Sequence, residues 1–142
     1  MIEQTLAIIK PDAVKNKYSG KILSMIEDTG FKIVAMRKLF ITEEMACSFY
    51  VVHKEKGFYN DLVKFMTSGS SIVMVLEKEN AVLDYRKLMG ATNPKDAENG
   101  TIRKLYASSI EANAVHGSDS KENATVEINF FFSKSDIIQF LG

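Results

Sequence analysis

Four segments of the chain carry the apolar patterns that are typical of β-strands. Residues 5–9 and 72–76 are short, almost wholly apolar runs rich in β-branched side chains, which predicts two buried strands. Residues 31–40 carry apolar side chains at both odd and even positions, which predicts a longer strand. Residues 128–132 hold one isoleucine and three phenylalanines, and we expect the last strand there.

The segments between these strands show the three- and four-residue spacing of amphipathic helices. Ser19 and Thr42 have side chains that can cap helices, and Gly30 can end the first of them. We expect helices over residues 19–29, from residue 43 onwards, over residues 58–66 and over residues 81–89.

The rest of the chain has little periodicity. Residues 90 to about 112 are rich in Gly, Asn, Pro and Thr, which predicts a long loop with one helical turn at Asn93-Pro94. Loops of this length in compact domains are usually functional or disordered. Residues 133–142 predict a short C-terminal turn of helix.

The order of these elements predicts an α+β fold in which helices cover a four-stranded antiparallel sheet. It is compatible with a ferredoxin-like βαββαβ sandwich, although order alone also permits a parallel α/β sheet. With 142 residues the chain can bury a full hydrophobic core, and we expect residues 1–142 to form a single domain.

Composition and charge narrow the class of protein. Eighteen basic residues balance eighteen acidic ones, so the chain lacks the basic excess of a dedicated nucleic-acid-binding domain. Any anionic ligand must therefore meet a local cluster of cations. Cys47 is the only cysteine, which excludes an internal disulfide and suits a reducing, cytoplasmic setting. We expect neither a signal peptide nor membrane association, because no apolar stretch approaches the roughly 20 residues that cross a bilayer.

The most distinctive stretch is the octapeptide 113–120, Asn-Ala-Val-His-Gly-Ser-Asp-Ser. His116 is one of two histidines; Gly117 brings backbone close to its ring, and Ser118 and Asp119 can hydrogen-bond to it. Because a histidine side chain titrates near neutral pH, it can act there as a nucleophile or a base. Taken alone, Gly, Ser and Asp in a row also fit an ordinary polar turn.

Four further short segments accompany the octapeptide. They are Ile9-Lys10-Pro11-Asp12-Ala13, Phe65-Met66-Thr67-Ser68-Gly69, Met89-Gly90-Ala91-Thr92-Asn93-Pro94 and Gly100-Thr101-Ile102-Arg103. Together with the octapeptide, and in this order, they make the chain resemble the nucleoside diphosphate kinase family from about Thr5 to Phe132.

The resemblance implies a ferredoxin-like fold and a cytoplasmic homo-oligomer, either a tetramer or a hexamer. It also implies ping-pong transfer of the γ-phosphoryl group from a nucleoside triphosphate, typically ATP, to a nucleoside diphosphate. This reaction maintains nucleoside triphosphate pools and uses Mg²⁺. We expect the ion to be held through the nucleotide phosphates, since no cluster of carboxylates in the sequence has ligand spacing.

The resemblance also assigns roles to individual residues. His116 matches the phosphorylated nucleophile, Glu127 the carboxylate beside it, Ser118 a hydroxyl in the same hydrogen-bond network and Tyr50 a tyrosine near the histidine. The residues expected against the nucleotide are Lys10, Arg86 and Arg103 at the phosphates, Thr92 as a hydroxyl donor to phosphate, Asn113 with Lys10 at the sugar, Phe58 stacked on the base, Leu62 and Ile110 beside Phe58, and His53 as a minor phosphate contact.

Several of these residues also fit an ordinary structural role. Each of the three cations, taken singly, is more often a surface charge, and Phe58 and Leu62 have the spacing of core residues in a helix. Two other functions stay open: a nucleotide-binding module without turnover, and a scaffold or nucleic-acid-binding protein on the same fold. Gly57, Ser70 and residues 104–106 depart from the family's usual pattern, which bears on loop rigidity or subunit contacts.

Overall fold

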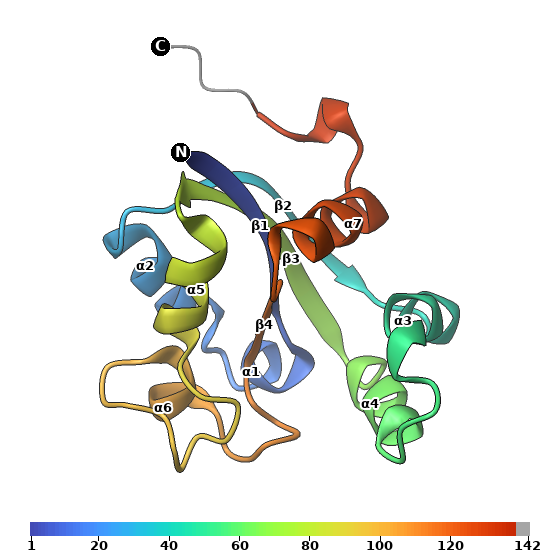
Figure 1. The fold of residues 1–142 in the computed structure, drawn as a ribbon. Coiled ribbons are helices and arrows are strands. Elements are labelled where there is room, and N and C mark those ends of the chain that lie inside the picture. Colours follow the sequence, from blue (N-terminus) through green and yellow to red (C-terminus); the bar gives the residue numbers. More distant parts are fainter. Residues whose placement is uncertain (139–142) are drawn as a thin grey trace.

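Four strands form one antiparallel sheet in the order β2–β3–β1–β4 (Figure 1). The computed structural model describes residues 1–138, apart from the side chain of Val52. The strands are β1 (Ile2–Ile9), β2 (Lys32–Phe40), β3 (Ser70–Glu79) and β4 (Val115–Gly117). This order, with every pair antiparallel, confirms the ferredoxin-like α+β fold and excludes the parallel sheet.

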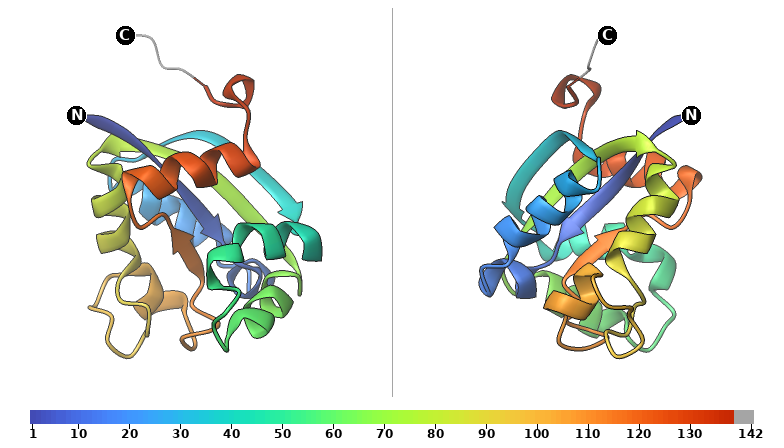
Figure 2. Two further views of the ribbon diagram at one scale, coloured as in Figure 1. Left: turned by 45° about the vertical axis from the view of Figure 1, so that its right-hand side comes forward. Right: turned by 90° about the vertical axis from the view of Figure 1, so that its left-hand side faces the viewer.

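Helices cover both faces of the sheet (Figures 1 and 2). The helices in the described part of the chain are α1 (Pro11–Lys15), α2 (Ser19–Asp28), α3 (Glu43–Phe49), α4 (Tyr59–Met66), α5 (Ala81–Met89), α6 (Ile102–Tyr106) and α7 (Lys121–Phe131), with 3₁₀ turns η1 (Val51–His53) and η2 (Lys134–Asp136). α1, α2, α5 and α6 pack on one face, and α3, α4 and α7 on the other. No helix among residues 1–138 is long and apolar enough to cross a membrane.

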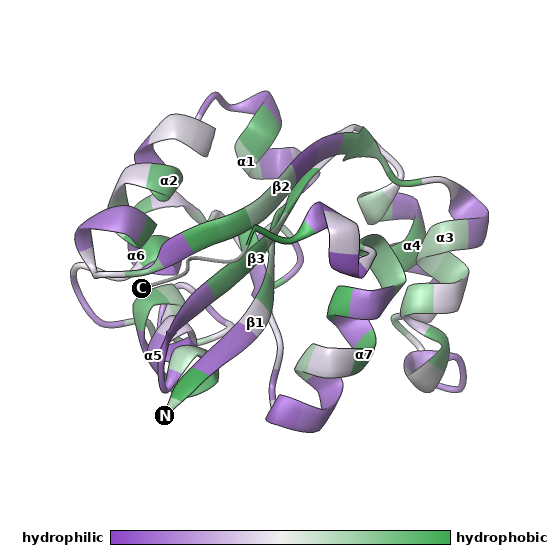
Figure 3. Ribbon diagram, turned by 90° about the horizontal axis from the view of Figure 1, so that it is seen from above, coloured by the Kyte–Doolittle hydropathy of each residue, from purple (hydrophilic) through white to green (hydrophobic). Residues whose placement is uncertain are grey.

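Alternation along the strands divides the interior into two cores. In β1, Ala7 and Ile9 join the core under α2 and α5, whereas Leu6 and Ile8 join the core under α3, α4 and α7. Figure 3 shows the resulting stretches of hydrophobic residues along the strands, with polar residues on loops and helix ends. The middle parts of the two central strands, residues 5–9 of β1 and 72–76 of β3, are therefore buried on both sides, which is why these runs are almost wholly apolar.

The expected last strand is wrong. Residues 128–131 form the last turn of α7 and Phe132 is its C-cap; the helix begins after Ser120, whose hydroxyl accepts a hydrogen bond from the Asn123 N–H. α7 buries Ala124, Ile128 and Phe131, so the helical spacing outweighs the strand preference of the aromatic run. The fourth strand is β4, whose three residues are too few to show an alternating pattern.

The other predicted elements are present, with some corrections at their ends. Thr42 caps α3 and Gly30 follows the end of α2, but Ser19 is the first residue of α2 rather than its cap. The expected loop 90–112 contains α6, capped by Thr101, and the helix α1 was not expected at all. Of the expected C-terminal turn, η2 is present, and residues 139–142 lie outside the described part.

Gly117 ends β4 where α5 crosses the sheet. A Cβ added there would lie 2.7 Å from Tyr85 Cδ2 and 2.8 Å from Met89 Cε. Because both neighbours are buried, Gly117→Ala is expected to lower the free energy of unfolding by about 1–3 kcal/mol. Urea denaturation measures this loss. Gly20→Ala is the matched control: Gly20 lies in the first turn of α2 with nothing within 4 Å of an added Cβ, so its stability should be unchanged or higher.

Candidate active site

A pocket of about 800 Å³ opens beside β4 and is walled by α4, α5, α7 and the loop around residue 110. Twelve of the thirteen site residues predicted from the sequence line it. Ser118 is the exception: it is fully buried and lies behind Glu127. The twelve lining residues are Lys10, Tyr50, His53, Phe58, Leu62, Arg86, Thr92, Arg103, Ile110, Asn113, His116 and Glu127.

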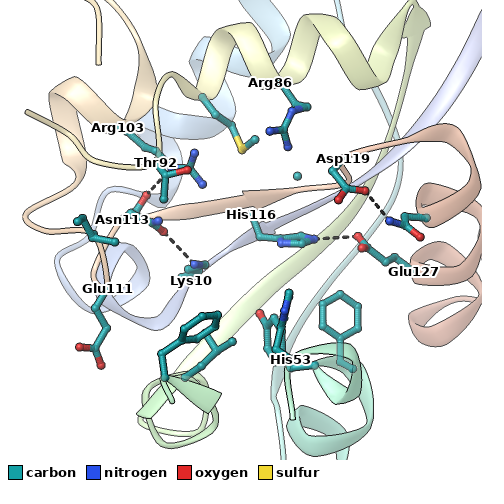
Figure 4. A pocket seen from close by; sticks show the side chains of 18 of the residues that line it. Lys10, His53, Arg86, Thr92, Arg103, Glu111, Asn113, His116, Asp119 and Glu127 are labelled. Atoms are coloured by element: carbon teal, nitrogen blue, oxygen red, sulfur yellow. Dashed lines mark hydrogen bonds and ion pairs between the residues drawn. The ribbon is translucent and has the colours of Figure 1, made fainter. Parts of the chain in front are cut away.

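His116 lies near the middle of this pocket, between the cations and α7 (Figure 4). It stands on β4 opposite Ile8 of β1, and Phe49 packs edge-on against its ring at 5.6 Å between centroids. The backbone position of the histidine is thus fixed by the sheet and its ring by an aromatic neighbour. These contacts exclude the plain polar turn that the Gly-Ser-Asp sequence would also fit.

A carboxylate sets the tautomer of His116. Glu127 Oε1 lies 2.8 Å from His116 Nε2, and the same oxygen accepts a 2.9 Å hydrogen bond from the Ser118 hydroxyl. Ser118 in turn accepts a hydrogen bond from the Leu6 N–H of β1. Since an ionised carboxylate only accepts hydrogen bonds, Nε2 carries the proton and the lone pair is left on Nδ1.

Replacing Glu127 should therefore change the rate of the reaction at His116. The resemblance implies that His116 is phosphorylated, and Glu127→Ala is expected to slow that step by about 100-fold, because the ring loses both its orientation and its tautomer preference. Rapid quench with radiolabelled ATP measures the rate. Glu122→Ala, an exposed glutamate of the same helix, is the control, and an equal loss in both variants would contradict the assignment.

Lys10 follows β1 and is nearly enclosed by its neighbours. Only 8% of it is exposed, and its ammonium group donates a 2.8 Å hydrogen bond to Asn113 Oδ1. Burial, together with the positive charge of Arg103, lowers the pKa of Lys10 to about 8, although Asp12 acts in the opposite direction. A solvated strand end, the structural alternative for Lys10, is thus excluded.

Arg103 belongs to α6, and its guanidinium group is buried against backbone. It donates hydrogen bonds to the carbonyl oxygens of Asn113 (3.3 Å), Gly90 (3.1 Å) and Val115 (2.9 Å). Burial lowers the pKa of this arginine, and nearby Arg86 acts in the same direction. Arg103 therefore joins the loop after α5, the turn before β4 and β4 itself, a structural role that the sequence alone did not indicate.

Aromatic and apolar side chains line another side of the pocket. The rings of Tyr50, His53 and Phe58 follow one another at centroid distances of 6.5 Å and 5.7 Å. Phe58 is 51% exposed and Ile110 is 59% exposed, so Phe58 is not the core residue that its spacing also allowed. Leu62 is partly buried and packs on the core beneath.

Tyr50 differs from its neighbours in being buried. In the described part of the chain its hydroxyl has no hydrogen-bond partner. Burial and the negative charge of Glu127 both raise the pKa of this phenol. The group therefore stays protonated, and it can form hydrogen bonds but does not carry a negative charge.

Sequence reasoning missed several residues of the pocket. Phe49 contacts the histidine ring, and Asn123 and Val126 of α7 line the wall beside it. Asp119, which the sequence suggested as a hydrogen-bond partner of His116, accepts a hydrogen bond from Asn123. Of the departures from the family's pattern, Tyr106 packs on Tyr18 at 4.9 Å, and Gly57 faces open space.

The pocket side chains in the described part of the chain do not form a metal-binding site by themselves. Among residues 1–138, no group of three or more His, Cys, Asp or Glu side chains is placed to hold a metal ion. Glu127 is engaged by His116 and Ser118, and Asp119 accepts a hydrogen bond from Asn123. The donor set therefore fits an ion that arrives with its own phosphate ligands.

A histidine with Nδ1 unprotonated, held by a carboxylate in a pocket that three cations also line, has the parts of a phosphotransferase that works through a histidine. Comparison with known proteins agrees. The family model "Nucleoside diphosphate kinase" matches residues 3–137. The chain is 59% identical over 136 residues to a nucleoside diphosphate kinase of Campylobacter jejuni, covering 96% of this chain and 99% of the relative. It is 52% identical over 138 residues to one of Persephonella marina, covering 97% and 99%.

Solved structures give the same answer. The crystal structure of the Aquifex aeolicus nucleoside diphosphate kinase superposes with a TM-score of 0.95 at 40% identity, covering 97% of this chain and 100% of that one. A Halobacterium salinarum nucleoside diphosphate kinase in complex with CDP also gives 0.95, at 36% identity, covering 100% and 95%. The chain belongs to the nucleoside diphosphate kinase family. It is a nucleotide-binding kinase of the ping-pong type that acts through a phosphohistidine, and kinases of this kind generally need a divalent metal.

Proposed function

We propose that Nδ1 of His116 is the atom that accepts the γ-phosphoryl group. Its lone pair attacks the γ-phosphorus in line, and the bond from that phosphorus to the β–γ bridging oxygen breaks as the diphosphate leaves. The positive charge that develops on the ring is stabilised by the Glu127 carboxylate, and the proton stays on Nε2. The 2.8 Å contact between Nε2 and Glu127 carries this proposal, because it determines which nitrogen reacts. A second diphosphate then takes the phosphoryl group back from Nδ1.

Lys10, Arg86 and Arg103 supply the positive charge that such a transfer needs. At an effective dielectric constant near 20, one opposite charge at about 4 Å contributes about 4 kcal/mol before desolvation. Phosphoryl transfer depends mainly on positioning and on this kind of charge stabilisation. Thr92, exposed on the pocket wall, adds a hydroxyl donor for phosphate, and His53 a minor contact.

The sugar and the base of the nucleotide are expected to bind beyond the phosphates, each against its own residues. Lys10 and Asn113, already joined by a hydrogen bond, meet the sugar hydroxyls. Phe58 stacks on the base, flanked by Leu62 and Ile110, which suits an enzyme that accepts any base because every base has a π-face. In this proposal residues 1–142 act as one catalytic domain, and residues 90–112 form its nucleotide-binding loop.

Mg²⁺ is proposed as the metal. When bound to the nucleotide, the ion would neutralise part of the phosphate charge that Lys10, Arg86 and Arg103 otherwise meet. The protein's own part is to hold the phosphates with Lys10, Arg86, Arg103 and Thr92 and to present Nδ1.

We further propose a cytoplasmic homo-oligomer, either a tetramer or a hexamer. The edge strand β2 exposes Met36 and Phe40, apolar side chains that a second copy can cover. Light scattering coupled to size exclusion measures the oligomer. With zero net charge, we expect no salt-dependent association with oligonucleotides.

Steady-state kinetics test the proposed reaction. With ATP varied at several fixed concentrations of a second nucleoside diphosphate, ping-pong transfer gives parallel lines in double-reciprocal plots. It also gives exchange of label between ATP and ADP when no second nucleotide is present. Intersecting lines without such exchange would mean direct transfer between two bound nucleotides and would contradict the role of His116.

A further inference from the structure

The backbone just before β4 makes an unusual turn at Ala114. This residue is fully buried and adopts a left-handed conformation with φ of 73°, although it has a side chain. Across it, the Val115 N–H donates a 2.8 Å hydrogen bond to the Asn113 carbonyl. A non-glycine residue keeps such a conformation only where its surroundings hold it. Asn113, on one side, reaches Lys10, and His116 lies two residues beyond on the other.

Both backbone polar groups of Ala114 are held by the segment that begins α1. The Lys10 N–H donates a 2.8 Å hydrogen bond to the Ala114 carbonyl. The Asp12 carboxylate accepts a 3.1 Å hydrogen bond from the Ala114 N–H. Arg103 donates hydrogen bonds to the carbonyls of Asn113 and Val115, on either side of Ala114. Among these contacts on the turn, Asp12 supplies the one acidic group.

The second oxygen of Asp12 is buried and has no hydrogen-bond partner in the described part of the chain. Burial raises the pKa of this carboxyl group, while the hydrogen bond from the Ala114 N–H and the charge of Lys10 lower it. A half-buried carboxylate with one oxygen left without a partner costs stability, so packing alone does not explain why an acid stands here.

Asp12 is also the carboxylate that opposes the loss of charge on Lys10. Arg103 of α6 disfavours the Lys10 cation, and burial does so more strongly. The other cations, carboxylates and histidines on the pocket wall are Arg86 of α5, His116 of β4, His53 of η1, Asp61 of α4, Glu111 of the loop, Asp119 before α7 and Glu127 of α7. Asp12 and Arg103 therefore have opposite effects on the same ammonium group.

Resting on the function proposed above, we propose that Asp12 is a positioning residue whose carboxylate holds the Ala114 turn, and hence Asn113 and His116. Its negative charge also favours the charged form of Lys10, whose ammonium group donates a hydrogen bond to Asn113. Asp12 does not touch the reacting atoms. Its effect reaches the chemistry through Lys10 and through the start of β4.

The test compares Asp12→Asn with Asp28→Asn, an exposed carboxylate at the end of α2. ADP affinity is measured by calorimetry from about pH 6 to about pH 10, with folding checked by circular dichroism. In the wild type, affinity falls as pH rises through the pKa of Lys10, which is about 8. In Asp12→Asn the fall is expected about one pH unit lower, because an opposing charge is lost. Asp28→Asn should follow the wild type, and an unshifted Asp12→Asn would overturn the proposal.

Asp12→Glu separates charge from position and decides the matter if Asp12→Asn does not fold. It keeps the carboxylate but displaces it by one methylene group. The alkaline fall in ADP affinity should stay near the wild type, while phosphorylation of His116 slows by about tenfold because the Ala114 turn shifts. A phosphorylation rate equal to wild type would overturn the positioning role.

The two proposals fail in different ways. A wild-type protein that binds ADP but takes no phosphoryl group from ATP would contradict the function proposed for His116. Normal transfer by the wild type, together with an unshifted alkaline limb in Asp12→Asn, would contradict only the role of Asp12.

Discussion

His116→Ala is expected to abolish phosphoryl transfer, with a loss of at least about 1000-fold, while nucleotide binding stays near that of the wild type. The variant lacks Nδ1 of His116, the ring nitrogen that the contact between Nε2 and Glu127 leaves unprotonated. Binding persists because Lys10, Arg86 and Phe58 remain in place. Turnover is measured with a coupled assay and binding by calorimetry with ADP.

His53→Ala is the matched control, since His53 is the other histidine and lines the same pocket. It should still become phosphorylated, with at most a weaker affinity for nucleotide. Turnover by His116→Ala, or loss of the phosphoenzyme in His53→Ala, would show that His116 is not the nucleophile.

Arg103→Ala is expected to lose both activity and stability. Truncation leaves the carbonyls of Gly90 and Val115 without their side-chain donor and removes one of two donors to the Asn113 carbonyl; each group left without a donor costs about 1–3 kcal/mol. We expect the free energy of unfolding to fall by at least about 3 kcal/mol and transfer to slow by at least about 100-fold. Urea denaturation and a coupled assay measure the two losses.

Lys104→Ala is the control, because Lys104 is the exposed neighbour of Arg103 in α6. Its stability should change by less than about 0.5 kcal/mol. Arg103→Lys should keep the charge but not the three bonds, so it should recover part of the rate and little of the stability. An Arg103→Ala protein as stable as the wild type would show that the backbone contacts are dispensable.

The sequence predicted the parts of the fold that have strong local patterns. β1 and β3 were found because both of their faces are buried, and Thr42 marked the start of α3 through its capping side chain. β4 was missed because three residues carry no pattern, and it is held as a strand only by pairing with β1. Residues 128–132 have a strand-like composition, yet Ser120 starts a helix that extends into them.

The candidate site was predicted more completely than the fold. Twelve of thirteen residues drawn from separated segments line one pocket, since the resemblance reflects residues that act together in space. The geometry was not predictable from the sequence. The choice of Nε2 as the proton-bearing nitrogen, the three carbonyl bonds of Arg103 and the left-handed Ala114 each depend on tertiary contacts with distant segments.

Phosphoryl transfer through His116 can be followed by intact mass spectrometry after brief exposure to ATP and Mg²⁺, with a subsequent chase by a deoxynucleoside diphosphate. We expect a gain of one acid-labile phosphoryl group, mapped to His116, that disappears on the chase as the deoxynucleoside triphosphate forms. A protein that binds ATP but gains no phosphoryl group, or keeps it through the chase, would rule out His116 as the carrier.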